Sequence, residues 1–337
     1  MKQKNKLLPG SLLCLLIGAV AWAMANYIPT VGKLIGGPVF AILLGMILAF
    51  WKRPSAMDAG ITFCSKKILQ YSIIFIGFGM NIRTVLATGG QSLAVMLCTI
   101  AASLLTAFLM GRVLKVPGNT ATLIGVGTSI CGGSAIAATA PVIEADDREV
   151  AYSISTIFLF NILAVFIFPA LGRVFHMTDT GFGIWAGTAI NDTSSVVAAG
   201  FTFSDAAGEL ATIVKLTRTL MIIPITLALT VHRTWKRKQQ GTAAASNYSI
   251  VKIFPWFVLG FLLTAILNST GWIPSAASSW LNELGKFGIM VAMAGIGLNT
   301  NLKSLVKNGV RPIALGLCCW FVVAMVSLVV QHLLHLV

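Results

Sequence analysis

Residues 127–138 read GTSICGGSAIAA, a run of small and hydroxyl-bearing residues inside a stretch where a membrane span is expected. Gly132 and Gly133 allow the backbone to leave helical geometry, and the neighbouring hydroxyls can satisfy or present the polar groups that are released. Small residues also let helices pack closely, so a single run of this kind is more typical of packing than of a binding site.

A second copy of this run favours function. Residues 187–198 read GTAINDTSSVVA and match the first run as G-T-x-I-x-x-x-S-x-x-x-A without a gap. The three residues 191–193, Asn-Asp-Thr, replace the Cys-Gly-Gly of the first copy. Asp192 therefore stands at membrane depth, where an acid is expensive to bury and a functional role is the default interpretation.

Composition sets the class of protein. The 337 residues are 57% hydrophobic and only 10% charged, with a mean hydropathy of +0.88. These values exclude a soluble globule, and the long continuous apolar runs exclude a barrel, so we expect an all-α integral membrane protein. The net charge of +14 comes from basic residues in short loops, which indicates the positive-inside rule and not a nucleic-acid partner.

Hydropathy predicts about 11 transmembrane helices, the first retained as a span and not removed as a signal peptide. The predicted spans cover approximately 7–25, 34–50, 68–80, 91–110, 120–142, 150–171, 181–199, 209–231, 250–267, 284–298 and 312–334. Counting from a cytoplasmic amino terminus places every basic loop inside, both acidic loops (144–147 and 205–209) outside, and the carboxyl terminus outside the cell membrane.

A further internal similarity is that between GFGMN at 77–81 and GIGLN at 295–299, which end spans of opposite predicted orientation. This pattern is typical of an inverted-topology repeat. We therefore expect an accessory helix in residues 1–33, a first five-helix repeat in 34–175 and a second in 176–337, with a basic cytoplasmic linker near 232–249. In this scheme the fifth and tenth spans are both discontinuous and cross near the bilayer centre, and the two copies at 127 and 187 run in the same direction.

Lys215 and Arg218 lie three residues apart in the eighth span and share a helical face. Lys215 can snorkel towards the outer end of its helix, but Arg218 is too deep to do so. Two cations near Asp192 leave a surplus positive charge, which suits an anion, and the planar fork of arginine suits an oxyanion. Asp192 either binds a coupling proton or sodium ion, or pairs with Arg218.

The runs GTSICGGSAIAATAPV and AGTAINDTSSVVAAG, with the GxG of the tenth span, resemble those of the YeiH-type sulfate exporter family. That family is placed with the bile acid, arsenite and riboflavin transporter superfamily. The resemblance implies an inverted-repeat transporter with crossed broken helices, and it does not fix sulfate as the substrate. Members of the family carry His-Glu, His-Asp or Asn-Asp in the second run. Asn191-Asp192 stands here, so no histidine is available to carry a proton.

These observations predict a secondary transporter that moves a small inorganic or organic anion, such as sulfate or a related oxyanion, by alternating access. A sodium or proton antiporter that uses Asp192, and a membrane sensor that binds a solute without moving it, remain open. Nucleotide, metal-ligand and hydrolase motifs are missing from the sequence, so we expect no enzyme and no cofactor besides a coupling ion. Membrane lipid is an expected partner, and homo-oligomerisation is left open. The predicted substrate-binding residues are Thr128, Ser129, Cys131, Gly132, Gly133, Ser134, Asn191, Asp192, Thr193, Ser194, Lys215, Arg218, Gly295, Gly297 and Asn299.

Overall fold

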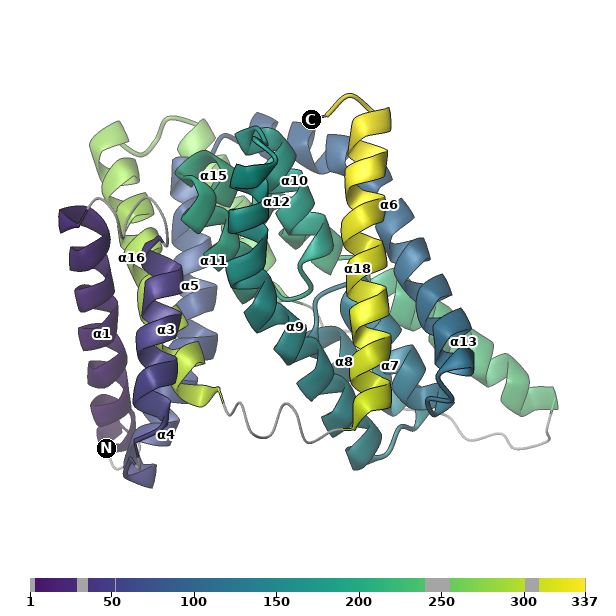
Figure 1. Cartoon of the computed structure of the whole chain (residues 1–337). Coiled ribbons are helices and arrows are strands. Elements are labelled where there is room, and N and C mark those ends of the chain that lie inside the picture. Colours follow the sequence, from purple (N-terminus) through teal and green to yellow (C-terminus); the bar gives the residue numbers. More distant parts are fainter. Residues whose placement is uncertain (1–3, 29–35, 52, 240–254, 301–308, 337) are drawn as a thin grey trace.

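The structure, a computed structural model, describes residues 4–28, 36–51, 53–239, 255–300 and 309–336 (Figure 1). Within these residues the chain is helical and contains no strand, which confirms the predicted all-α class. Seven helical segments among them are long and apolar enough to cross a membrane, as expected for a multi-pass membrane protein. These segments are Leu7–Tyr27, Ser55–Gly79, Ile82–Val113, Asp147–Val174, Asp205–Val231, Ser275–Asn299 and Val310–Leu333.

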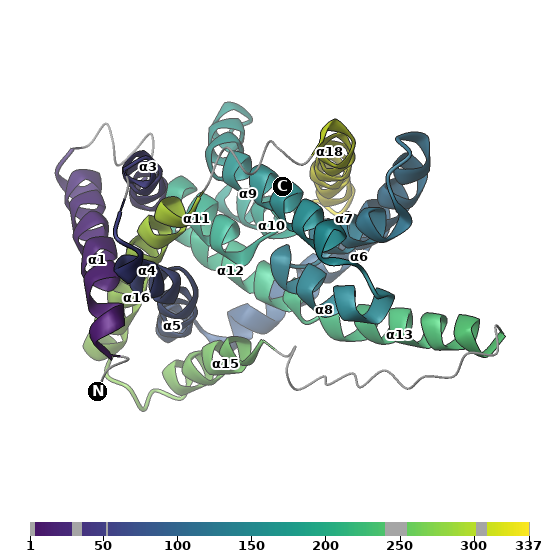
Figure 2. The ribbon, with the colours of Figure 1, turned by 90° about the horizontal axis from the view of Figure 1, so that it is seen from below.

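The helices form two groups that Figure 2 shows on opposite sides of the molecule. The first group, here called the α16 bundle, surrounds α16, which packs against α1, α3 and α5. Its members are α1 (Lys4–Tyr27), α3 (Gly37–Ala49), η1 (Ser55–Met57), α4 (Asp58–Phe63), η2 (Cys64–Ile68), α5 (Leu69–Ile76), η3 (Gly77–Gly79), α15 (Trp256–Ser269) and α16 (Ser275–Asn299).

The second group, here called the hairpin bundle, contains the remaining helices. They are α6 (Ile82–Val113), α7 (Gly118–Ser129), α8 (Gly133–Ile143), α9 (Asp147–Val174), α10 (Asp179–Ala189), α11 (Thr193–Phe203), α12 (Asp205–Thr219), α13 (Ile222–Gln239) and α18 (Val310–Leu333). One apolar core joins the two bundles, because Ile42 of α3 and Met293 of α16 belong to the same cluster as Val197 of α11 and Ile213 of α12. Each bundle takes helices from both ends of the chain, since α15 and α16 pack with α1, α3, α4 and α5.

Helices α7 and α8 form a hairpin, here called hairpin A, whose two ends lie at the same end of the molecule. Asn119, near the start of α7, donates from Nδ2 to Oε2 of Glu149 in the first turn of α9 over 3.0 Å. Helix α8 ends at Ile143 and leads into the same end of α9 through only three residues. Hairpin A therefore enters the molecule and returns without crossing it.

Helices α10 and α11 form a second hairpin, here called hairpin B, at the opposite end of α9. Ser204, directly after α11, donates to Oδ1 of Asp179 at the start of α10 over 2.6 Å. Gly183 of α10 and Gly200 of α11 both pack closely on the Ala207–Ala211 turns of α12. Because α9 has 28 residues, about 42 Å of helix separates the open ends of the two hairpins.

Two predictions about topology are wrong. The two related runs do not run in the same direction, because hairpin B enters from the end opposite to hairpin A (Figure 1). The acidic residues 144–147 also do not lie across the membrane from Arg112 and Lys115, because the C-terminus of α6 and both ends of hairpin A share one end. A hairpin and a full span have the same apolar length, so hydropathy does not separate them.

The remaining predictions on architecture are not settled by these helices. The count of 11 spans is not confirmed, since two of the predicted spans fold back as hairpins. The two five-helix repeats stay a prediction. The boundary predicted between residues 33 and 34, and the part of the predicted linker beyond residue 239, lie outside the described residues.

Candidate functional site at the hairpin tips

The tip of hairpin A breaks where the glycine pair predicts. Helix α7 ends at Ser129, and Ile130 leaves helical geometry with φ −121° and ψ −86°. Gly132 then takes φ +67° and ψ −127°, a conformation that a side chain disfavours, before α8 begins at Gly133. The break leaves the first amides of α8 and the last carbonyls of α7 without partners within their own helices.

Substitution of Gly132 by alanine should lower the free energy of unfolding by about 1–3 kcal/mol, because the strained backbone is tolerated only by glycine. Gly133→Ala is the matched control. Gly133 is helical, and a Cβ there would contact only the ring of Phe158, at 3.8 Å. We expect the control to stay within about 0.5 kcal/mol of the parent. Chemical denaturation in detergent measures both variants, and equal losses for the two would contradict the argument.

The tip of hairpin B carries its own acid. Helix α10 ends at Ala189, Ile190 is extended, and Asp192 is the N-cap residue of α11. The Asp192 carboxylate accepts a hydrogen bond from the Ser194 amide over 3.0 Å and a second from the Ser194 hydroxyl, both at Oδ2. Asn191 is buried and Asp192 is half-buried. The positive end of α11 is therefore neutralised from within its own hairpin.

Lys215 of α12 ties the two tips together. Its side chain is fully buried. The Nζ atom donates to the carbonyl of Ile130 in hairpin A over 2.8 Å and to that of Ile190 in hairpin B over 2.9 Å, and also to the carbonyl of Asn191. These three contacts use all three donors of the ammonium group. The charge thus stabilises the negative ends of α7 and α10.

Arg218 makes the same kind of bridge one turn further along α12. It is also fully buried. Its Nε donates to the Ser129 carbonyl over 2.7 Å and its Nη2 to the Thr128 carbonyl over 2.8 Å, while Nη1 reaches the Thr188 carbonyl of hairpin B. Hence both cations donate hydrogen bonds to backbone carbonyls at the two hairpin tips.

The ion pair considered between Asp192 and Arg218 does not form in the structure. The Asp192 carboxylate accepts hydrogen bonds from Ser194, and the Arg218 guanidinium donates to the carbonyls of residues 128, 129 and 188. Of the two roles left open for Asp192, the pairing role is therefore not supported.

Asn161 of α9 also lies at the tips, although it is not among the site residues predicted from the sequence. It is 2% exposed, and its Oδ1 accepts from the Asp192 amide over 3.2 Å. Its Nδ2 has no hydrogen-bond partner, and both side-chain polar atoms of Asn191 are also unpartnered. Buried amides without partners are rare, and at a convergence of helix ends they indicate a place for a polar ligand. The sequence signal for this residue is that an asparagine side chain stands in the middle of an apolar span.

Most of the predicted site residues therefore meet. Thr128 and Ser129 form the last turn of α7 and contribute carbonyls, and Cys131 is buried in the tip. Ser134, in the first turn of α8, is exposed, and Thr193 is half-buried at the start of α11. The tips thus bring together the N-terminal ends of α8 and α11 and the C-terminal ends of α7 and α10. Asp192, Lys215 and Arg218 lie at the same place.

Gly295, Gly297 and Asn299 lie elsewhere, in the α16 bundle. Helix α16 runs unbroken from Ser275 to Asn299, so the prediction of a discontinuous tenth span that crosses the fifth is wrong. A Cβ on Gly297 would lie 2.3 Å from the Ile42 carbonyl, and one on Gly295 would lie 3.0 Å from the Ser65 amide. These glycines allow close helix packing, which is the structural role that small residues often have in membranes.

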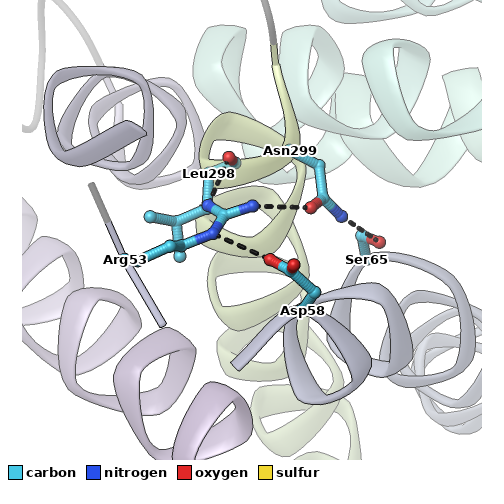
Figure 3. A network of polar contacts seen from close by, with 5 residues as sticks. All are labelled: Arg53, Asp58, Ser65, Leu298 and Asn299. Carbon is cyan, nitrogen blue, oxygen red and sulfur yellow. Dashed lines mark hydrogen bonds and ion pairs between the residues drawn. The ribbon is translucent and has the colours of Figure 1, made fainter. Parts of the chain in front are cut away.

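The end of α16 is fixed by a polar network that Figure 3 shows. Arg53 donates to the Leu298 carbonyl over 2.6 Å, to Oδ1 of Asn299 over 3.3 Å and to Oδ1 of Asp58 over 3.0 Å. Asn299 in turn donates to Ser65 over 3.4 Å. The guanidinium thus caps the carbonyl end of α16, and Asn299 serves this cap and does not reach the hairpin tips.

Comparison with known proteins identifies the family. Residues 9–316 match the family model described as conserved hypothetical protein 698. A UPF0324 membrane protein of Streptococcus mutans is 50% identical over 99% of both chains, and one of Fusobacterium nucleatum is 44% identical over 98% of this chain and 99% of its own. The names of these relatives state no substrate. The chain belongs to the conserved hypothetical protein 698 family of UPF0324 membrane proteins.

Proposed function

We propose that the protein is a secondary transporter that binds a small inorganic or organic anion between the tips of hairpins A and B. The observation that carries this proposal is the meeting of two oppositely directed hairpins beside the unpartnered amides of Asn161 and Asn191. Broken helices in transporters direct their amide ends at anionic groups. Non-helical backbone at membrane depth is tolerated where it lines such a site.

The arrangement also supports alternating access. Hairpin A opens at the start of α9 and hairpin B at its end, so each hairpin stands between the tips and a different end of the molecule. A solute held between the tips can be released towards one end by movement at hairpin A and towards the other by movement at hairpin B. We place the end where hairpin A opens in the cytoplasm, because Arg112 and Lys115 lie there.

Flux into proteoliposomes tests the proposal. Sulfate is the first probe, because the sequence resembles that of the YeiH-type family. We expect saturable uptake of at least one radiolabelled small anion, inhibited by other small anions, with a dependence on a proton or sodium gradient that identifies the coupling ion. Protein-free liposomes are the control. Saturable binding of anions without flux would overturn transport in favour of a solute sensor.

Asp192 supports a second candidate, a sodium or proton antiporter. Its carboxylate is half-buried, and Oδ1 of the neighbouring Asn191 has no partner. Oxygen atoms of this kind are ligands that hard cations prefer. Sodium-driven proton movement in liposomes without any transported anion, and its loss in Asp192→Asn, would favour this candidate over anion transport.

A further inference from the structure

The two hairpins repeat one another in structure as well as in sequence. Helix α8 spans residues 133–143 and α11 spans residues 193–203, so a constant offset of 60 residues relates the two half-helices. By this offset Ser134 corresponds to Ser194, and Gly132 corresponds to Asp192. The two tips thus differ at one decisive position, the residue that precedes each half-helix.

In hairpin B the residue that precedes the half-helix is Asp192. There the Asp192 carboxylate is held by the amide and the hydroxyl of Ser194, at one oxygen. In hairpin A the equivalent residue is Gly132, which has no side chain and makes no side-chain cap to α8. The first amides of a helix have no intrahelical partner, so the amides of Gly133 and Ser134 are left for another acceptor. The tip of hairpin B therefore has a side-chain carboxylate at the start of α11, and the tip of hairpin A has none at the start of α8.

A second observation points to a ligand at the same position. A Cβ built on Gly132 would lie 3.6 Å from the unpartnered Nδ2 of Asn161, and 3.4 Å from both Cβ of Asp192 and Cγ2 of Ile157. Asn161 is 2% exposed, so its free donor is buried, and it lies close to the residue that precedes α8. A buried donor and the amide end of α8 therefore meet at one place, and Ser134 lies in the first turn of the same helix.

We infer that this place binds the carboxylate of a small monovalent organic acid, in the manner in which the Asp192 carboxylate sits on α11. The inference rests on the proposed function and names its substrate class. The Ser134 amide and hydroxyl donate to one carboxylate oxygen, and Nδ2 of Asn161 donates to the carboxylate from α9.

Charge favours a monovalent anion over sulfate. Lys215 and Arg218 contribute two positive charges at the tips and Asp192 contributes one negative charge, which leaves a single formal positive charge. A carboxylate balances this charge, whereas a sulfate dianion would leave a net negative charge away from water, which is unfavourable.

The experiment compares radiolabelled L-lactate and radiolabelled sulfate in proteoliposomes at pH 7.5, together with thermal shifts of the purified protein in formate, acetate, lactate and sulfate. We expect saturable lactate flux and stabilisation by the three carboxylates at concentrations where sulfate has no effect. Sulfate flux without lactate flux overturns the carboxylate inference and leaves anion transport standing. Saturable flux of neither anion overturns both.

Two variants locate the site. Ser134→Ala should raise the KM for lactate about tenfold or more, because a hydrogen bond to a charged group is lost. Asn161→Asp keeps the acceptor for the Asp192 amide but replaces the free donor by an anionic oxygen, so it should weaken lactate binding further. Thr122→Ala on α7 is the matched control, because the Thr122 hydroxyl is exposed and bonded to its own helix at Gly118. Unchanged KM in both site variants would overturn the inference.

Discussion

Lys215→Met is expected to lower the free energy of unfolding by about 3–5 kcal/mol and to abolish transport. Methionine fits the volume of the buried stem but donates no hydrogen bond. The carbonyls of Ile130, Ile190 and Asn191 then lose their common partner in a site without access to water. Because these carbonyls belong to different hairpins, the loss separates the two tips and does not merely weaken one helix end.

Lys286→Met is the matched control for this prediction. Lys286 also lies on a spanning helix, α16, but it contacts the exposed acids Asp205 and Glu283 over 2.7 and 2.9 Å. Ion pairs with exposed partners contribute about 1 kcal/mol or less, so the control should remain close to the parent. Thermal unfolding in detergent and the monodisperse fraction on size-exclusion chromatography measure both variants. A Lys215→Met protein as stable as Lys286→Met would show that the hairpin tips do not depend on the cation.

The sequence predicts the hairpin tips well because their cause is local. Gly132 occupies a backbone conformation that only glycine tolerates, and Asp192 caps a helix in the way that aspartate generally does. Both features are visible in a few consecutive residues. The same local reasoning fails for Gly295 and Gly297, because glycine serves close packing as readily as a break, and only the neighbouring backbone of α3 and α4 decides between them.

Topology and charge are the features that the sequence does not determine. A pair of half-helices of 11 or 12 residues each has the apolar length of one span whether it continues straight or folds back. The direction is set by distant contacts, such as that between Asn119 and Glu149. Likewise, the spacing of Lys215 and Arg218 shows that they share a face but not that carbonyls of two hairpins occupy their donors. That Lys215 and Arg218 bind the anion directly therefore stays a prediction, while the structure shows their donors engaged with these carbonyls.

Arg218→Met is expected to reduce the maximal rate of transport about a hundredfold while the KM for the anion changes less than threefold. The guanidinium contacts the carbonyls of Ser129, Thr128 and Thr188. Its loss therefore disturbs the relative position of the hairpins more than the amide end of α8, where we place the anion. A side chain that positions a site affects turnover, whereas a ligand-binding side chain affects affinity as well.

Arg218→Lys separates geometry from charge. If the site needs only a positive charge at this depth, lysine restores most of the rate. If it needs the planar fork that reaches carbonyls of both hairpins at once, a single ammonium on a flexible stem restores little of it, and Arg218→Lys is nearly as slow as Arg218→Met. We expect the second result, measured as initial rates of flux in variants that first pass the chromatographic test for folding. A large rise in KM that lysine reverses would instead place the anion directly on Arg218, because the charge alone would then account for binding.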